Sequence, residues 1–143
     1  MIISVRHTAI VVSNLEKSKF FYESIGFCVF ASSVEKGGTI DQVTGMDGVI
    51  LEWVKLKSID GFVLELLQYH SHEDTPCCSV IPPNRLGYSH MAITVNNIYD
   101  SCEKIISLGG RVINKPSISK DGKVKLVYCY DIEGALLEIV EEL

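Results

Sequence analysis

Apolar and polar residues alternate along two short stretches of the chain that closely resemble one another. The first is "RHTAIVVSN" at residues 6–14, and the second is "SHMAITVNN" at residues 89–97. Alternation with a period of two predicts a β-strand with one buried face. Histidine is second in each stretch, and the two histidines, His7 and His90, are 83 residues apart. The pattern therefore predicts two copies of one structural unit.

An amphipathic segment follows each of these predicted strands. The segments are "NLEKSKFFYESIG" at residues 14–26 and "NIYDSCEKIISLG" at residues 97–109, and both carry apolar residues at helical spacing. Each begins with Asn, a good N-cap, and ends with Gly, a good C-terminal stop. Both segments are therefore predicted to be helices with an apolar stripe facing a core. The stripe residues are Leu15, Phe20 or Phe21, and Ile25 in the first helix, and Ile98, Cys102, Ile105 and Leu108 in the second.

Strand patterns return after each predicted helix. They predict strands at 27–33, 48–57 and 62–69 in the first half, and at 111–113, 123–130 and 135–141 in the second half. Residues 35–46 are expected to form a loop with a short helical turn, and "SIDG" and "DIEG" are expected to be turns. Each half is thus a strand, a helix and three strands, and the predicted fold class is α+β. We expect one domain made of module one (1–71), a linker (72–86) and module two (87–143).

Composition narrows the classes of function. The chain has 143 residues, of which 47% are hydrophobic and 22% charged, values that are typical of a soluble globular protein. The net charge of −5, without a basic cluster, argues against nucleic acid as a partner. Apolar runs are much shorter than the ~20 residues of a membrane helix, and we find no secretion-signal pattern. The cysteines contain no CxxC pair and are expected to be reduced thiols of a cytoplasmic protein. They are Cys28, Cys77, Cys78, Cys102 and Cys129.

Four residues at matching positions of the repeat are candidate metal ligands. Parity places His7, Ala9 and Val11 on one face of the first strand, opposite the face that should cover the helix, and His90 repeats this arrangement. Glu65 in "LELL" and Glu138 in "LEIV" occupy matching places in the last strands. A carboxylate buried among apolar residues is costly without a partner, and a divalent cation removes that cost. Singly, each residue has an ordinary structural explanation, but the matched set favours a metal site for Ni, Co, Fe, Mn or Zn.

The chain resembles the vicinal oxygen chelate superfamily, which includes glyoxalase I (lactoylglutathione lyase), methylmalonyl-CoA epimerase, extradiol dioxygenases, and fosfomycin and bleomycin resistance proteins. The resemblance covers nearly the whole sequence and rests on "RHTAIVVSNLEKSKFFYESIGF", "LELLQY", "GYSHMAITVNN" and "DIEGALLEIVEE". It implies two tandem βαβββ modules packed side by side into one curled-sheet metal cradle. It also implies one metal ligand from the first strand and one from the last strand of each module. Those positions hold His7, Glu65, His90 and Glu138.

The resemblance further implies a divalent-metal-dependent enzyme that chelates vicinal oxygens of a small-molecule substrate and moves a proton through an enolate. The closest types are glyoxalase I, a lyase, and methylmalonyl-CoA epimerase, an isomerase. Glu138 is expected to be the general base, with Glu65 as the second candidate. The alternatives are a non-catalytic binding or resistance protein of the same fold and an extradiol dioxygenase. Dioxygenases resemble the chain less, because they leave the position of Glu65 non-coordinating.

Two features of the sequence bear on the choice between a glyoxalase and an epimerase, and they point in opposite directions. Epimerases typically carry a second catalytic Glu where this chain has Met46, with Asp47 beside it, which puts epimerase identity in doubt. The generous linker instead favours both modules of one chain around one metal, as in epimerases.

We expect a homodimer formed through sheet edges or through residues 36–47. Parity does not decide which further side chains touch substrate; the candidates are Trp53, Lys123 and Lys125, whereas His70 and His72 are interpreted as solvated.

Overall fold

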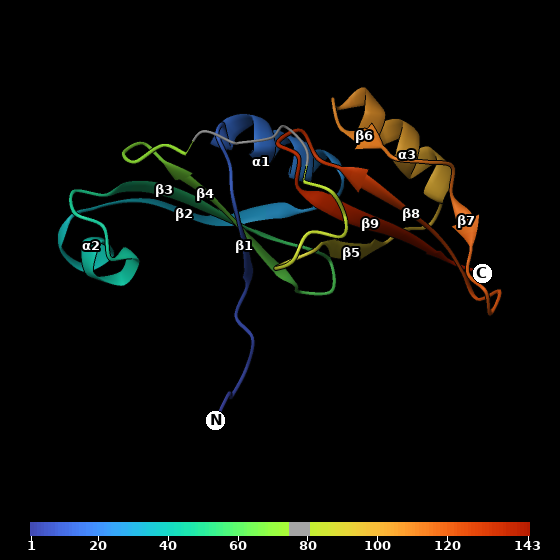
Figure 1. Ribbon diagram of the computed structural model, residues 1–143, viewed down its shortest axis with the longest axis horizontal. Helices are drawn as coiled ribbons and strands as arrows, with labels where there is room; N and C mark the ends of the chain where they lie inside the picture. The colour runs from blue at the N-terminus through green and yellow to red at the C-terminus, as the bar shows by residue number, and fades with distance from the viewer. Residues whose placement is uncertain (75–80) are drawn as a thin grey trace. The chain divides into compact units, whose positions relative to one another are not determined.

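The computed structural model describes residues 1–74 and 81–143 of the chain. It divides into two compact units, Met1–Thr75 and Pro76–Leu143. Within the described residues there are three helices and two open sheets (Figure 1). Each unit begins with a strand and a helix and ends with the long strands of its sheet. The predicted α+β class and the repeated module are therefore confirmed.

The first unit contains one four-stranded sheet in the order β1-β4-β3-β2. Strand β1 runs parallel to β4, and the other neighbours are antiparallel. Strand β2 continues three residues beyond its predicted end, because its backbone stays paired with β3 along that length. The elements are β1 (Thr8–Val11), α1 (Leu15–Ser24), β2 (Cys28–Lys36), α2 (Gly38–Thr44), β3 (Ile50–Lys57) and β4 (Val63–Tyr69).

The second unit repeats this topology with the order β5-β9-β8-β6, and β5 is again parallel to β9. An additional short strand, β7, pairs with β8 and was not predicted from the sequence. Pro116 stands between β6 and β7, and because proline has no backbone N–H it interrupts strand pairing there. The elements are β5 (Met91–Thr94), α3 (Ile98–Ser107), β6 (Arg111–Val112), β7 (Ser117–Ile118), β8 (Val124–Tyr130) and β9 (Leu136–Glu142).

The insert between β2 and β3 forms α2, a helix of seven residues where a short helical turn was expected. Figure 1 shows it beyond the ends of these two strands. The carboxylate of Asp41 accepts hydrogen bonds from the backbone N–H groups of Gly48 (3.0 Å) and Val49 (2.8 Å), which closes the loop after the helix. Ile40 packs with Val49 and Leu51 in a small apolar cluster. The insert is therefore an ordered part of the first unit.

The predicted helix boundaries are confirmed by the capping contacts. The side chain of Asn14 accepts a hydrogen bond from the backbone N–H of Lys17, and Asn97 caps α3 in the same way. Gly26 and Gly109 follow the helix ends with φ of 111° and 92°, which L side chains rarely adopt. The longest described helices have ten residues. In the described ranges none combines the length and apolar character needed to cross a membrane.

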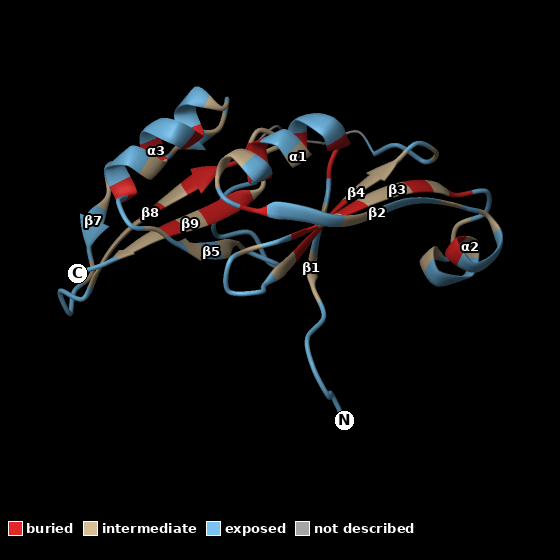
Figure 2. Cartoon of the chain, turned by 180° about the vertical axis from the view of Figure 1, so that it is seen from behind, coloured by how far each residue is buried: buried red, intermediate tan, exposed pale blue. Residues whose placement is uncertain are grey.

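The core of each unit lies between one face of its sheet and its long helix (Figure 2). Phe21 is the buried phenylalanine of the first helix, whereas Phe20 is 64% exposed. The other faces of β1 and β5, which carry Ala9 and Ala92, are exposed. The predicted division into a helix-facing side and an open side is therefore correct. The buried residues include Leu15, Phe21, Leu56, Leu64 and Leu66 in the first unit, and Ile98, Ile105, Leu137 and Ile139 in the second.

A side chain from the last strand holds the start of the helix in each unit. The backbone N–H of Leu15, the first residue of α1, donates to Oε1 of Gln68 on β4 at 2.8 Å. The backbone N–H of Ile98, the first residue of α3, donates to Oε2 of Glu141 on β9 at 2.8 Å. The first N–H groups of a helix have no partner within the helix, so these side chains satisfy donors that would otherwise be orphaned. The repeat thus extends to contacts on the helix-facing side of each sheet.

Candidate metal centre

The first half of the candidate site is formed by His7 and Glu65. His7 immediately precedes β1, and the parallel pairing of β1 with β4 places Ala9 opposite Glu65. Since side chains alternate along a strand, His7 and Glu65 project from the same sheet face. Nε2 of His7 lies 2.9 Å from Oε2 of Glu65. Both groups are on the face away from α1.

The second half is formed by His90 and Glu138 in the equivalent positions. The pairing of β5 with β9 places Ala92 opposite Glu138, so His90 and Glu138 share a face. Nε2 of His90 lies 3.4 Å from Oε2 of Glu138. The His90 ring also packs against the ring of Tyr128, with centroids 5.0 Å apart, and its Nδ1 lies 3.0 Å from Oγ of Ser89. These contacts orient Nε2 toward the carboxylate.

The spacing within each pair fits two ligands of one metal ion. Donors that each lie ~2.1 Å from an ion are about 3.0 Å apart at an octahedral angle and about 3.4 Å apart at a tetrahedral angle. The observed separations of 2.9 Å and 3.4 Å agree with these values. A hydrogen bond between imidazole and carboxylate has the length of the first pair, whereas the 3.4 Å of the second pair exceeds the usual N–H···O range.

The structure brings the four predicted ligands together as two pairs. His7 and Glu65 belong to the first compact unit, and His90 and Glu138 belong to the second. Across residues 1–74 and 81–143, no group of three or more His, Cys, Asp or Glu side chains is gathered that could hold a metal ion. The convergence of all four on one ion stays a prediction.

Two residues that the sequence reasoning missed lie directly across from the carboxylates. In the antiparallel pairing of β3 with β4, Lys55 is opposite Glu65, and in that of β8 with β9, Tyr128 is opposite Glu138. Nζ of Lys55 lies 3.3 Å from Oε1 of Glu65 and 4.6 Å from the centre of the Trp53 ring. The two carboxylates therefore differ in their surroundings, since one has an ammonium partner and the other an aromatic neighbour.

A hollow of about 240 Å³ opens beside Glu138 in the second unit. Its walls include the apolar side chains of Ile113 and Leu126, the phenol of Tyr128, and Lys115. Ligand sites of this kind are concave and largely apolar, with a few polar groups that orient the ligand. Glu138 thus faces a space that a small molecule can enter.

The strand registers also assign the residues whose facing parity left open. Trp53 pairs with Leu67 and therefore lies on the same face as Glu65, and its Nε1 donates to Oε1 of Glu35 at 2.7 Å. Lys125 lies on the helix-facing side of the second sheet, where Nζ is 3.3 Å from Oε1 of Glu141. Trp53 is therefore a candidate wall of the site, and Lys125 is not.

The remaining side chains lie away from the candidate ligands. His70 pairs with Glu52 at 2.8 Å on the helix-facing side of the first sheet, and His72 and Lys123 are exposed. Met46, at the place of the second epimerase carboxylate, packs against the apolar cluster beside α2. The neighbouring Asp47 is exposed.

The described cysteines are free thiols. Cys28 is exposed, whereas Cys102 and Cys129 are buried. Burial raises the pKa of Cys102, and burial, reinforced by Cys102 and Asp131, raises the pKa of Cys129 to about 12. Both thiols are therefore protonated at neutral pH and serve as small apolar core residues. Cys77 and Cys78 lie outside the described residues.

Residues 4–139 match the family model described as the Glyoxalase/Bleomycin resistance protein/Dioxygenase superfamily. The chain therefore belongs to this superfamily, which confirms the family indicated by the sequence motifs.

Curated relatives in this superfamily are bacterial lactoylglutathione lyases. The chain is 25% identical over 137 residues to the enzyme of Neisseria meningitidis serogroup A, which covers 95% of this chain and 88% of the relative. It is 33% identical over 55 residues to a probable lactoylglutathione lyase of Synechocystis, which covers 38% of this chain and 42% of the relative. The chain thus spans about two fifths of the length of the relatives that it matches with higher identity.

Solved structures confirm the fold. A glyoxalase family protein from Bacillus cereus superimposes with a TM-score of 0.92 and 24% identity, covering 100% of this chain and 96% of that one. The fosfomycin resistance protein FosX from Listeria monocytogenes, complexed with Mn(II) and sulfate, has a TM-score of 0.64 and 17% identity, covering 100% and 95%. At these identities the likeness concerns the fold alone.

Proposed function

We propose that the protein is a divalent-metal-dependent lyase or isomerase of the glyoxalase I or methylmalonyl-CoA epimerase type. The observation that carries this proposal is the His–Glu pair repeated at equivalent positions of the two units, with a donor spacing that suits metal ligands. Relatives named lactoylglutathione lyase support it, as does the Mn(II) complex of a protein with the same fold.

His7, Glu65, His90 and Glu138 would hold the ion, and we propose that all four come from one chain. Two imidazole nitrogens and two carboxylates suit Ni, Co, Zn, Fe or Mn. When bound, the ion would stabilise negative charge on two vicinal oxygens of a small-molecule substrate, such as a hemithioacetal or a thioester. The protein is proposed to act in the cytoplasm as a homodimer.

The surroundings of the two carboxylates favour Glu138 as the residue that moves the proton. Glu65 is buried, with 9% exposure, and is held between the imidazole of His7 and the ammonium of Lys55. Glu138 lines the hollow and, among the described residues, has no Lys or Arg within ion-pair distance. A base must reach the substrate and must be able to accept a proton, and Glu138 meets both conditions better.

The proton transfer assigned to Glu138 is balanced without a further reactant. Its carboxylate accepts the proton from a C–H group beside the substrate carbonyl, and the electron pair of that bond passes into the enolate. In a glyoxalase reaction the same carboxylic acid then returns the proton to the neighbouring carbon. An epimerase reaction requires a proton from a second acid on the opposite face of the enolate, so Glu138 alone accounts for the glyoxalase reaction. The apolar side chains of Ile113 and Leu126 limit the access of water to the enolate.

The test compares Glu138→Gln with Glu65→Gln after metal analysis of each purified protein. Incubation in deuterated water with a hemithioacetal, a methylmalonyl thioester or a catechol, followed by mass measurement, reports exchange and turnover. Glu138→Gln should keep most of its metal, since an amide oxygen remains, yet lose roughly 10²–10⁴-fold in exchange. Glu65→Gln also keeps an amide oxygen, so it should keep a similar amount of metal and lose less exchange than Glu138→Gln, because Glu65 is not the proposed base.

Other outcomes would assign the alternatives. A wild-type protein that binds no divalent metal but retains a small molecule would be a binding or resistance protein. A metal-loaded protein that consumes oxygen with the catechol and exchanges no deuterium would be a dioxygenase. Either result would overturn the proposed isomerase chemistry.

A further inference from the structure

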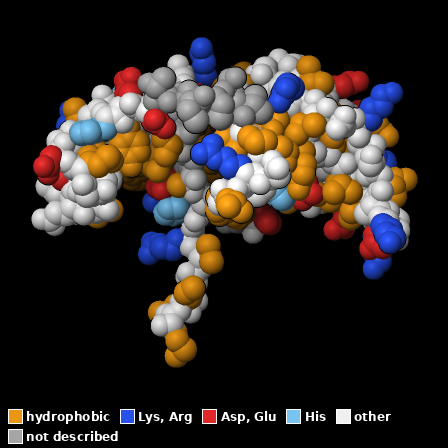
Figure 3. All heavy atoms as spheres, in the orientation of Figure 1, with side chains coloured by type: hydrophobic (Ala, Val, Ile, Leu, Met, Phe, Trp, Pro, Cys, Tyr) orange, Lys and Arg blue, Asp and Glu red, His pale blue; other side chains and the backbone are white. Residues whose placement is uncertain are grey.

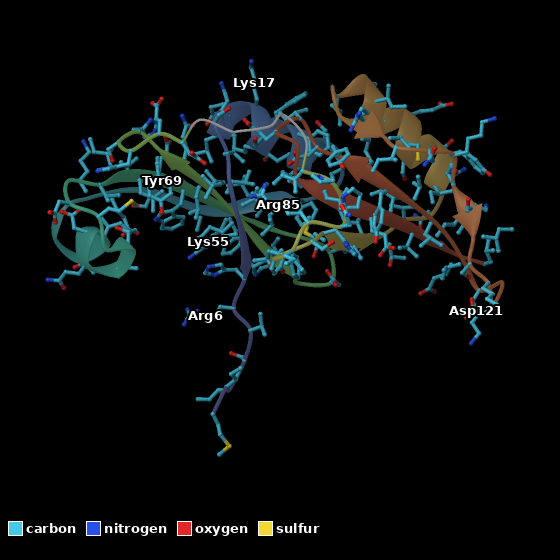
Figure 4. The ribbon with its side chains drawn as sticks, viewed as in Figure 1. Arg6, Lys17, Lys55, Tyr69, Arg85 and Asp121 are labelled. Carbon is cyan, nitrogen blue, oxygen red and sulfur yellow. The ribbon has the colours of Figure 1, made fainter. Side chains whose placement is uncertain are left out.

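Lys55 occupies an unusual place for a lysine. It is labelled in Figure 4 and extends from β3. The strand register places it on the face that carries Glu65 and Trp53, and its side chain is only 29% exposed. The ammonium contacts Oε1 of Glu65 and lies over the Trp53 ring. The apolar residues Leu67 and Tyr69 continue this face toward α2, where hydrophobic side chains gather in Figure 3. A positive charge is thus fixed on an otherwise largely apolar wall.

Metal binding would leave this charge with only part of its partner. Oε1 of Glu65 contacts Lys55, whereas Oε2 lies beside His7 and would bind the ion. The single charge of this carboxylate would then be shared between the ammonium and a divalent cation, which weakens the attraction between Glu65 and Lys55. A half-buried ammonium needs a counter-charge, because burial of an unpaired ion is costly. A negatively charged group of the substrate would provide it.

The equivalent position of the second unit shows that the fold does not require a lysine there. Tyr128 lies opposite Glu138 in the same register as Lys55 opposite Glu65. The Tyr128 ring packs against the imidazole of His90 and carries no charge. The lysine is therefore a feature of one wall of the site and not of the repeated scaffold.

On the basis of the proposed metal function, we infer that Lys55 is a specificity-determining residue that selects substrates with an anionic group beside the chelating oxygens. The anionic group is a carboxylate or a phosphonate. The ammonium of Lys55, which lies over the Trp53 ring, turns from Glu65 toward the substrate. Lys55 therefore binds substrate charge and takes no part in the proton transfer.

The experiment uses the full chain and three hydroxamates that chelate through the same two oxygens. Acetohydroxamate is the form without an anionic arm, malonic monohydroxamate adds a carboxylate, and phosphonoacetohydroxamate adds a phosphonate. The variants are Lys55→Met, which keeps a flexible side chain without the charge, Lys55→Arg, which keeps the charge, and Lys57→Met. Lys57 is the matched control, since it lies two residues further on the same strand and its Nζ is placed over Phe30. Thermal unfolding establishes that each variant is folded.

Co²⁺ titration comes first, read by the fluorescence of Trp53, the single tryptophan of the chain. Lys55→Met should bind Co²⁺ roughly threefold to fivefold more tightly than wild type, because the ammonium no longer competes for Glu65. Lys57→Met should bind Co²⁺ as wild type does. A wild-type protein that binds no Co²⁺ would overturn the proposed function and this inference together.

The hydroxamates are then titrated into the Co²⁺-loaded proteins. Wild type, Lys55→Arg and Lys57→Met should bind one of the anionic hydroxamates about tenfold or more tightly than acetohydroxamate, and Lys55→Met should lose that preference. The preferred arm identifies carboxylate or phosphonate. A fully metal-loaded wild type without any preference, or a preference that survives in Lys55→Met, would overturn the role of Lys55 while leaving the metal function standing.

Discussion

Replacing Gln68 with Leu removes the acceptor that ties the first turn of α1 to strand β4. The backbone N–H of Leu15 donates to Gln68 Oε1 at 2.8 Å in a part-buried position, and Leu15 itself is only 2% exposed. Water can therefore replace the lost acceptor only in part. An unsatisfied donor of this kind costs about 1–2 kcal/mol of the free energy of unfolding. In a chain of this size the cost corresponds to a decrease of about 3–8 °C in Tm.

Gln68→Glu is the matched control, because it keeps an oxygen acceptor at the same place and copies the residue that the second unit uses. A carboxylate also interacts favourably with the N-terminus of a helix, but Glu52 lies directly opposite residue 68 and repels it, so this variant should have a Tm close to that of wild type at neutral pH. Thermal unfolding followed by far-ultraviolet circular dichroism gives Tm for each protein. Gln68 lies on the face opposite Glu65, so metal affinity should not change in either variant. A Gln68→Leu protein with the Tm of wild type would refute the role assigned to this hydrogen bond.

Three further predictions concern the second unit. The hydrogen bond from the Ile98 backbone N–H lowers the pKa of Glu141 from its ordinary value of 4.5, so the ionised carboxylate stabilises the fold above pH 4.5 and this stabilisation is lost as the pH falls through the lowered pKa. The Tm of Glu141→Gln should therefore fall less steeply with acid than the Tm of wild type, and parallel curves would contradict this. A Cβ at Gly110 would lie 2.7 Å from the backbone carbonyl oxygen of Tyr130. Gly110→Ala should therefore lower the free energy of unfolding by about 1–3 kcal/mol in a denaturant titration. An unchanged midpoint would contradict this and show that the backbone shifts to accept the methyl group. His90→Ala should weaken metal binding at least tenfold in a titration. His70→Ala should leave metal binding unchanged, because the His70 ring pairs with Glu52 on the helix-facing side of the first sheet. Equal losses in both variants would contradict the assigned ligands.

Features of the fold that depend on nearby residues could be predicted from the sequence. The caps at Asn14 and Asn97 follow from contacts within one helical turn, and the facing of His7 follows from the two-residue period of a strand. Each of these inferences needs only a few neighbouring residues.

The contacts that were missed join residues far apart in the chain. Gln68 and Leu15 are 53 residues apart, and a polar residue near the end of a strand gives no local sign that it holds a helix. Lys55 could have been found, because the turn at 58–61 brings residue 57 opposite 63 and hence Lys55 opposite Glu65. The facing of Trp53 required the same register. In a hairpin the turn determines the register of every cross-strand pair, including those of Lys55 and Trp53.

The cross-strand neighbours of the two carboxylates have a consequence for how such a protein can change over generations. The residues proposed to hold metal are duplicated in kind, His with Glu in each unit, whereas the residues beside them, Lys55 and Tyr128, are not. A mutation of Lys55 alters one wall of the site and leaves its counterpart in the other unit untouched. The two-unit architecture thus separates positions that are repeated in both units from positions that differ between them. Under the proposed role of Lys55, a substitution there would change substrate preference without altering any of the four proposed metal ligands.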